Sequence, residues 1–255
     1  MLEDAYLSCG VVGTSSLYET ECINNKGNKM NITSTHLEVH LTNSKPVTRD
    51  NVRWPYALNE NGQPLRVLVS DTEKVSSIHD IIDWLDVEDA RRYAKVKGKT
   101  FCNIYAYDYC YLCQAYIPRV WWKKSALKRI KNGEIVKPKY GVTVNELTAN
   151  AIFDWFEKYG AIFSWHSTTD LTELQKAANQ GKVCLIIAKR KIKGRSGHVV
   201  AVVPENEVFQ AKRESGIVVQ PVESQAGEFN HEYITKGHQW WKKSKFSGFR
   251  FWTHD

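Results

Sequence analysis

The sequence contains no run of the ~18 consecutive apolar residues that a membrane-spanning helix needs, so we expect a soluble protein. Residues 1–10 also lack the basic start and the long apolar core of a secretory signal. We therefore expect either a mature form of the protein or synthesis in the cytoplasm without a signal peptide.

Cysteines are few and scattered, with six in 255 residues, which argues against a disulfide framework in a chain of this size. Most should be free thiols. Cys9 and Cys22 lie in a segment rich in Gly, Ser, Thr and Asn, and they could form a disulfide in an oxidising compartment. Cys110 and Cys113 have the C-x-x-C spacing of a zinc site, but no second pair follows at matching spacing. We expect neither a metal nor another cofactor.

Positive charge is in excess, with 35 Lys and Arg against 28 Asp and Glu, a net charge of +7. This balance favours an anionic partner such as nucleic acid, a membrane surface or an acidic cell-wall polymer. The basic stretch 123–139, next to Trp121 and Trp122, resembles a nucleic-acid-binding surface. No recognised nucleic-acid module surrounds it, so we favour a basic loop at the edge of a cleft.

The first hundred residues combine strand and helix patterns. Apolar residues alternate at 37, 39 and 41, which predicts a half-buried strand over 32–41. His36, Glu38 and His40 would share its other face, and we interpret them as solvated rather than as a metal site. Further patterns predict a strand over 65–69 and helices over 76–85 and 87–96.

An apolar helix is predicted from about residue 102 to 116, with Thr100 as its N-cap and Pro118 as its stop. Cys102 then lies in the first turn, where free backbone N–H groups and the helix dipole should lower the pKa of the thiol. Cys102 is therefore the candidate nucleophile. The other thiols near or after it, at positions 110, 113 and 184, lie in apolar surroundings that suit inert packing.

His198 is the candidate base, because it follows a turn of small residues and begins a strand of packed valines. A group that orients its imidazole could come from the next strand, where Glu223 and Gln225 point to the same face. We rank Glu223 first, since a carboxylate stabilises an imidazolium, and Gln225 second. Helices come before consecutive short strands in this region, which predicts an α+β fold with an antiparallel sheet.

The segments 100–103, 151–160, 174–181, 196–205 and 224–227 together resemble bacterial and phage papain-like cell-wall hydrolases. These are the NlpC-like and CHAP-like cysteine peptidases and amidases, some of which act as antibacterial effectors of type VI secretion. The order of the elements is the specific part of the resemblance. The chain departs from the pattern at the third catalytic position, where it has no histidine.

The resemblance implies a papain-like catalytic domain over 98–255, with helices packed on a small antiparallel sheet. Residues 1–97 would form an N-terminal extension or a small accessory domain. The implied activity is cleavage of peptidoglycan stem peptides or of the glycan–peptide amide, through a thioester on Cys102 with His198 as base. The implied route is export by a specialised secretion system or by lysis to the periplasm or cell wall. An immunity protein or a secretion-system component is the expected further partner.

The expected substrate contacts are aromatic rings that could stack on sugars and one polar side chain next to the nucleophile. They are Trp121, Trp122, Trp165 and Asn103. Two alternatives stay open at this point. One is a secreted enzyme that cleaves, deamidates or transamidates host protein with the same Cys102 and His198 pair. The other is a basic nucleic-acid-binding module.

Overall fold

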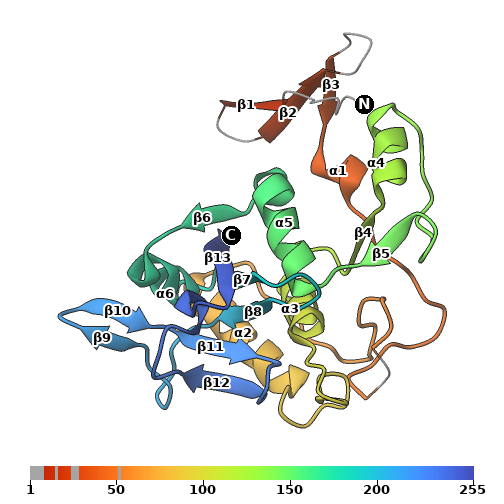
Figure 1. Ribbon diagram of the computed structural model, residues 1–255. Helices are drawn as coiled ribbons and strands as arrows, with labels where there is room; N and C mark the ends of the chain where they lie inside the picture. The colour runs from red at the N-terminus through yellow and green to blue at the C-terminus, as the bar shows by residue number, and fades with distance from the viewer. Residues whose placement is uncertain (1–8, 15–16, 24–28, 51–52) are drawn as a thin grey trace.

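Helices and strands surround one central sheet in the computed structural model, which describes residues 9–14, 17–23, 29–50 and 53–255 (Figure 1). The sheet has six strands in the order β12-β11-β8-β7-β13-β6, and each neighbouring pair is antiparallel. The predicted α+β class is confirmed. The strands are β6 His166–Thr168, β7 Val183–Arg190, β8 His198–Val202, β11 Val222–Gln225, β12 His231–Thr235 and β13 Phe246–His254.

The main helices are α2 Asp71–Leu85, α3 Cys102–Leu112, α5 Ala149–Tyr159 and α6 Leu171–Asn179. The short helical elements are α1 Ser34–Leu37, α4 Lys124–Lys131, η1 Gly160–Phe163 and η2 Trp240–Lys242. Small antiparallel sheets pair β4 Val120–Trp122 with β5 Val144–Glu146, and β9 Lys212–Glu214 with β10 Ile217–Gln220. No described helix is long and apolar enough to cross a membrane.

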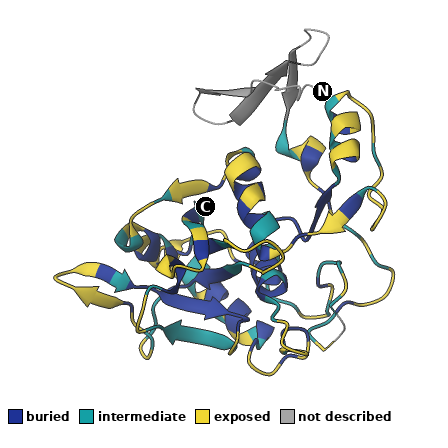
Figure 2. Cartoon of the chain, in the orientation of Figure 1, coloured by how far each residue is buried: buried dark blue, intermediate teal, exposed yellow. Residues whose placement is uncertain are grey.

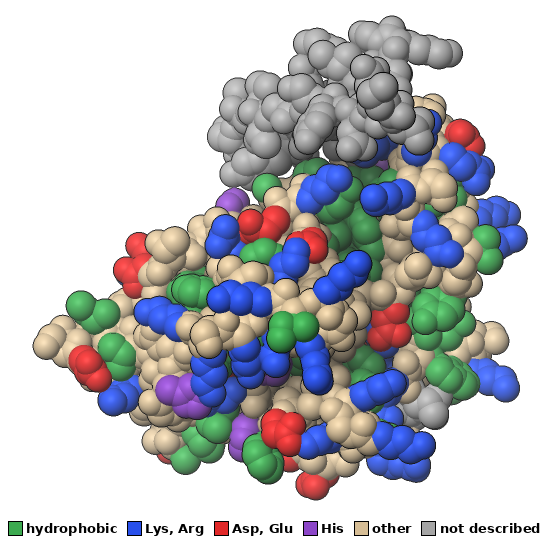
Figure 3. Space-filling model, viewed as in Figure 1, with side chains coloured by type: hydrophobic (Ala, Val, Ile, Leu, Met, Phe, Trp, Pro, Cys, Tyr) green, Lys and Arg blue, Asp and Glu red, His purple; other side chains and the backbone are tan. Residues whose placement is uncertain are grey.

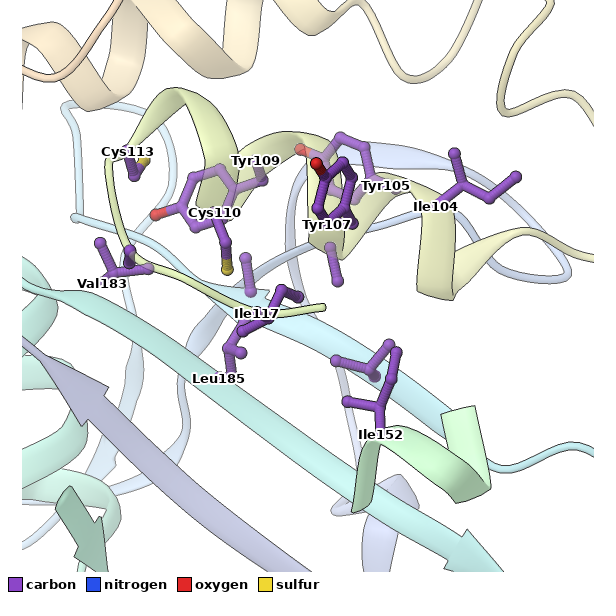
Figure 4. Packing of buried hydrophobic residues seen from close by; sticks show 14 of the residues in the cluster. Ile104, Tyr105, Tyr107, Tyr109, Cys110, Cys113, Ile117, Ile152, Val183 and Leu185 are labelled. Carbon is purple, nitrogen blue, oxygen red and sulfur yellow. The ribbon is translucent and has the colours of Figure 1, made fainter. Parts of the chain in front are cut away.

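Both faces of the sheet are covered, because alternate residues of its central strands point to opposite sides. On β7, Leu185 and Ile187 pack in the cluster that contains α2, α3 and α5, whereas Ile186 packs with α6 and Trp241. This double burial explains the uninterrupted apolar sequence of β7. Figure 2 shows the buried residues concentrated on these elements, and Figure 4 shows the α3 side of the packing.

Helix α3 is buried on nearly all sides, including Tyr105, Tyr109 and the charged Asp108. The Asp108 carboxylate accepts hydrogen bonds from Arg92 Nε at 2.6 Å and Nη2 at 3.1 Å, and from the Tyr93 hydroxyl at 3.0 Å. Arg92 and Asp108 are both fully buried. A buried charge is tolerated only when it is paired in this way, so the segment before α3 fixes the helix in the core.

Residues before position 98 contribute to the same core as the rest of the chain. Ile78 and Ile82 of α2 belong to the apolar cluster that holds Tyr105 of α3. Helix α2 begins at Asp71, earlier than predicted, because the Ser70 and Glu73 side chains form a capping box. The packing thus continues across the predicted domain boundary at residue 98.

Three predictions for this part of the chain are wrong. Residues 32–41 form no long strand, although Leu37 and Val39 are buried as their alternation required. The segment 87–96 is a series of turns, and the Arg53 side chain binds the backbone carbonyl of Arg91, which a helix over these residues would use. The segment 65–69 joins no sheet. Its backbone bonds α3 instead, since the backbone N–H of Arg66 donates to the carbonyl of Leu112, the last residue of α3, at 3.0 Å.

The N-terminal strands β1 Cys9–Thr14, β2 Leu17–Ile23 and β3 Lys29–Ile32 form a separate antiparallel sheet. Cys9 lies directly opposite Cys22 in its register. Directly opposed residues in an antiparallel pair have Cα separations that a disulfide can span. The two side chains lie outside the described residues, so the disulfide stays a prediction.

The buried Arg92–Asp108 pair should be essential to stability. Asp108→Asn leaves the Arg92 cation in the core without its counter-charge, which should lower the free energy of unfolding by about 3 to 5 kcal/mol. Urea denaturation would measure this loss. The control is Glu134→Gln in the exposed Arg129–Glu134 pair, where we expect a change below about 1 kcal/mol. Equal losses in the two variants would contradict the anchoring role of Asp108.

Candidate active site

Cys102 is the first residue of α3, so the helix start places its sulfur among free backbone N–H groups. The backbone N–H groups of Val199, Asn103 and Cys102 itself act to lower the pKa of this sulfur. Burial outweighs them, since the residue is only 3% exposed, and the pKa of the Cys102 thiol is raised. The expected lowering of this pKa is therefore wrong. The predicted cap is also wrong, because Phe101 holds the N-cap position without a side-chain hydrogen bond.

The effect of the Val199 N–H on the pKa of Cys102 places the sulfur beside the start of β8. Strand β11 pairs with β8 only at Val202 and Ala201. The first residues of β8 therefore keep backbone groups on that side that no strand neighbour uses. This end of β8 is where the N-terminus of α3 meets the sheet (Figure 1).

His198 begins β8, as predicted, and its ring is held by a neighbouring strand. Its Nε2 lies 2.8 Å from Oε1 of Gln225 on β11. The Gln225 amide nitrogen donates to the carbonyl of Phe229 at 3.1 Å, which fixes the amide with its oxygen toward the imidazole. The Nε2 atom must then be the donor, and Nδ1 is left without a proton in the neutral ring.

The imidazole is neutral at pH 7. Burial, together with the positive charges of Lys236 and Lys245, lowers the pKa of His198 to about 4, although the Gln225 hydrogen bond acts in the opposite direction. The ring of Trp240 packs against it edge-on, with the centroids 4.8 Å apart. The site therefore holds a neutral imidazole and, at the same pH, a neutral Cys102 thiol.

Glu223 does not contact His198, so the geometry reverses the predicted ranking and favours Gln225 as the orienting group. The Glu223 carboxylate accepts hydrogen bonds from Trp240 Nε1 at 2.9 and 3.1 Å and lies 3.2 Å from Lys236 Nζ. Lys236 Nζ also donates to Gln225 Oε1 at 2.7 Å. Sequence reasoning missed Lys236, because nothing in the pattern separates it from the other cationic residues of the chain.

The thiol and the imidazole approach the start of β8 from its two sides. Val199 packs in the cluster that contains α3, whereas the ring of His198 contacts Trp240 in the cluster on the other face. Within the described residues no hydrogen bond joins Cys102 to His198. Catalytic hydrogen bonds that are long in a free enzyme commonly tighten when substrate binds.

The three tryptophans among the predicted substrate contacts are not on the surface. Trp121, Trp122 and Trp165 are buried at 9%, 7% and 1% exposure, too little to stack on a sugar ring. The indole N–H of Trp122 donates to the Leu37 carbonyl, and that of Trp165 donates to the Tyr116 carbonyl, both at 2.8 Å. These tryptophans are core residues, so the prediction that they contact sugar rings is wrong.

The Asn103 side chain bonds a backbone carbonyl of a neighbouring segment. Its amide nitrogen donates to the Leu147 carbonyl at 2.9 Å, which ties the start of α3 to the segment before α5. This contact supports a positioning role beside Cys102. The expected substrate contact at Asn103 stays a prediction.

Among the thiols that the structure describes, Cys110, Cys113 and Cys184 are buried in the apolar surroundings that the sequence predicts, and their inertness stays a prediction. Burial raises the pKa of Cys110, Cys113 and Cys184, in the case of Cys113 to about 12. Among the side chains that the structure describes, no group of three potential metal ligands comes together. His40 bonds Glu38 at 2.8 Å, and both side chains are exposed.

No family model matches this chain, and no curated protein matches it either. Its function is therefore inferred from the arrangement of Cys102, His198 and Gln225.

The raised pKa of Cys102 and the lowered pKa of His198 predict the pH dependence of thiol reactivity. The thiolate is the reactive form, and its fraction grows with pH as long as the pH is below the thiol pKa. The rate of Cys102 alkylation by iodoacetamide should therefore rise about tenfold per pH unit between pH 6 and 8. Peptide mapping by mass spectrometry measures this rate for Cys102 alone. A rate independent of pH across this range would instead indicate a preformed thiolate–imidazolium pair.

Proposed function

We propose that this protein is a cysteine hydrolase of amide bonds, with Cys102 as nucleophile, His198 as base and Gln225 as the group that orients the imidazole. One observation carries the proposal. The backbone N–H of Val199, the residue next to His198, acts on the Cys102 sulfur to lower its pKa, while Gln225 holds Nε2 of the His198 imidazole at 2.8 Å. A helix-start cysteine, a strand-start histidine and an amide on the next strand are the parts of a papain-like site.

The chemistry starts from a neutral pair. The Cys102 sulfur attacks the amide carbonyl and forms a C–S bond, while its proton passes to Nδ1 of His198. This step requires the imidazole to move to the α3 side of β8 when substrate binds. Backbone N–H groups at the start of α3 are suited to stabilise the oxyanion. The C–N bond then breaks as His198 protonates the leaving amine. Finally, His198 takes a proton from water, which attacks the thioester. The C–S bond breaks and the imidazolium returns the proton to the sulfur, which releases a carboxylic acid and restores the Cys102 thiol and the neutral imidazole.

The buried side chains around the pair fit this reaction. A neutral His198 can accept a proton at pH 7, whereas an imidazolium could not. The Gln225 amide keeps the ring in the Nε2–H tautomer and so leaves Nδ1 as the proton acceptor. The buried ring of Trp240 packs edge-on against the His198 imidazole, with the centroids 4.8 Å apart.

We propose peptidoglycan as the substrate, as the resemblance to NlpC-like and CHAP-like hydrolases implies. The excess of positive charge supports this choice, because it would draw the enzyme to an anionic wall. On this proposal the fold is papain-like, and an antibacterial effector or lysin is its biological setting. A nucleic-acid-binding module receives less support, because Trp121 and Trp122 are buried and cannot stack on bases.

Digestion of purified peptidoglycan tests the proposal. Mass spectrometry of the soluble products should find fragments that carry a new amine or a new carboxylate. Cys102→Ala should lower the rate by at least about 10³-fold, because it removes the nucleophile. The control is Cys184→Ala, which removes a buried thiol from the other face of the sheet and should keep most of the activity.

Intact peptidoglycan after incubation, together with cleavage or deamidation of protein substrates, would favour the host-protein enzyme instead. Steeply salt-dependent binding of DNA that survives Cys102→Ala, without any hydrolysis, would favour the nucleic-acid module.

A further inference from the structure

Two cationic side chains share one aromatic ring on the His198 side of the sheet. Arg190 on β7 is paired in register with Phe246 on β13, and its guanidinium carbon lies 5.8 Å from the centroid of that ring. Lys245 Nζ lies 5.1 Å from the same centroid. The Lys245 carbonyl accepts a hydrogen bond from the backbone N–H of Lys191 at 3.0 Å, which fixes this segment to the end of β7.

This pair of cations is connected to the candidate base by ring contacts. The rings of Phe246 and Trp240 have centroids 5.7 Å apart, and Trp240 contacts the imidazole of His198 at 4.8 Å. Lys236 contacts both Trp240 and Gln225. Its Nζ lies 5.6 Å from the Trp240 ring centroid and 2.7 Å from the amide oxygen of Gln225. The cations and the base therefore belong to one contiguous group of side chains.

The cationic side chains of this group outnumber the carboxylates that pair with them. Glu223 pairs with Lys236, but no carboxylate in the described part of the chain lies within ion-pair distance of Arg190, Lys243 or Lys245. The Nε of Arg190 is buried and has no hydrogen-bond partner among these residues. The pKa of Lys245 is lowered by burial and by the charges of Arg190, Lys243 and Lys236. An anion placed beside these side chains would relieve this repulsion.

The surface around the group is also cationic. Lys191, Lys193 and Arg195 are exposed in the connection between β7 and β8, which leads directly to His198. Figure 3 shows Lys and Arg side chains gathered across the middle of the visible face, in the region where this connection lies in Figure 1. Such a field concentrates anionic groups at the entrance to a site.

We propose that Arg190, Lys243 and Lys245 form a binding subsite, on the His198 side of the sheet, for a carboxylate that the substrate carries. The guanidinium fork of Arg190 suits the planar carboxylate, and the two lysines add point charges. The identity of the amide rests on the proposed function. The subsite explains how a basic enzyme would select acidic peptide stems over neutral amides.

A matched pair of probes tests the subsite without turnover. The full chain with Cys102→Ala is titrated with N-acetyl-alanyl-D-glutamate and with the diamide of the same compound. The indole N–H resonance of Trp240 reports binding near the group. At low ionic strength the dicarboxylate should bind at least about fivefold more tightly than the diamide.

Removal of the cations should remove this preference. Adding Arg190→Gln and Lys245→Gln should bring the affinity ratio of the two probes close to one. Lys243→Gln, at an exposed position where the fold is not at risk, should lower the ratio about twofold. The charge-matched control carries Lys128→Gln and Lys131→Gln on α4 and should keep the full ratio.

Equal binding of the two probes, no binding of either, or an unchanged ratio after removal of Arg190 and Lys245 would overturn the subsite. The proposed function is tested by a different result. If the wild-type protein cleaves no peptidoglycan but still prefers the dicarboxylate probe, the hydrolase proposal is wrong and the subsite stands.

Discussion

The packing of α3 against the central sheet is the constraint on which the candidate site depends. The helix is buried on nearly all sides, and its one charged residue, Asp108, is neutralised by the equally buried Arg92. The Tyr105 hydroxyl bonds the Ser224 hydroxyl at 2.5 Å and ties the helix to β11. Because α3 can neither rotate nor slide without breaking these contacts, its first residue is held at the start of β8.

The same burial determines the chemistry that the site can perform. A helix start usually favours a thiolate, but here desolvation is the larger effect and the pKa of the Cys102 thiol is raised. Desolvation also lowers the pKa of His198. The two groups are therefore poised as a neutral acid and a neutral base, and charge would develop only when a carbonyl is attacked. The Gln225 amide suits this state, since it orients the imidazole without adding a charge.

Local patterns in the sequence were sufficient to predict Cys102 at a helix start, His198 at a strand start and an antiparallel α+β fold. They could not rank Glu223 against Gln225, because both point to one face and a register shift lies between them in the pairing with β12. Nor could they separate core tryptophans from surface ones, since burial depends on contacts between distant segments. The pKa of Cys102 was mispredicted for the same reason, because local sequence reveals the helix dipole but not the depth of burial.

The central claim is that His198 offers an unprotonated Nδ1 to the thiol of Cys102 across the end of β8. Nitrogen-15 NMR of labelled histidine at pH 7 tests it most directly, since the two ring nitrogens report the tautomer and their surroundings. We predict a neutral His198 protonated at Nε2, with an Nδ1 resonance that shifts in Cys102→Ala and not in Cys184→Ala. A proton on Nδ1, or an Nδ1 resonance that ignores the loss of Cys102, would contradict the account.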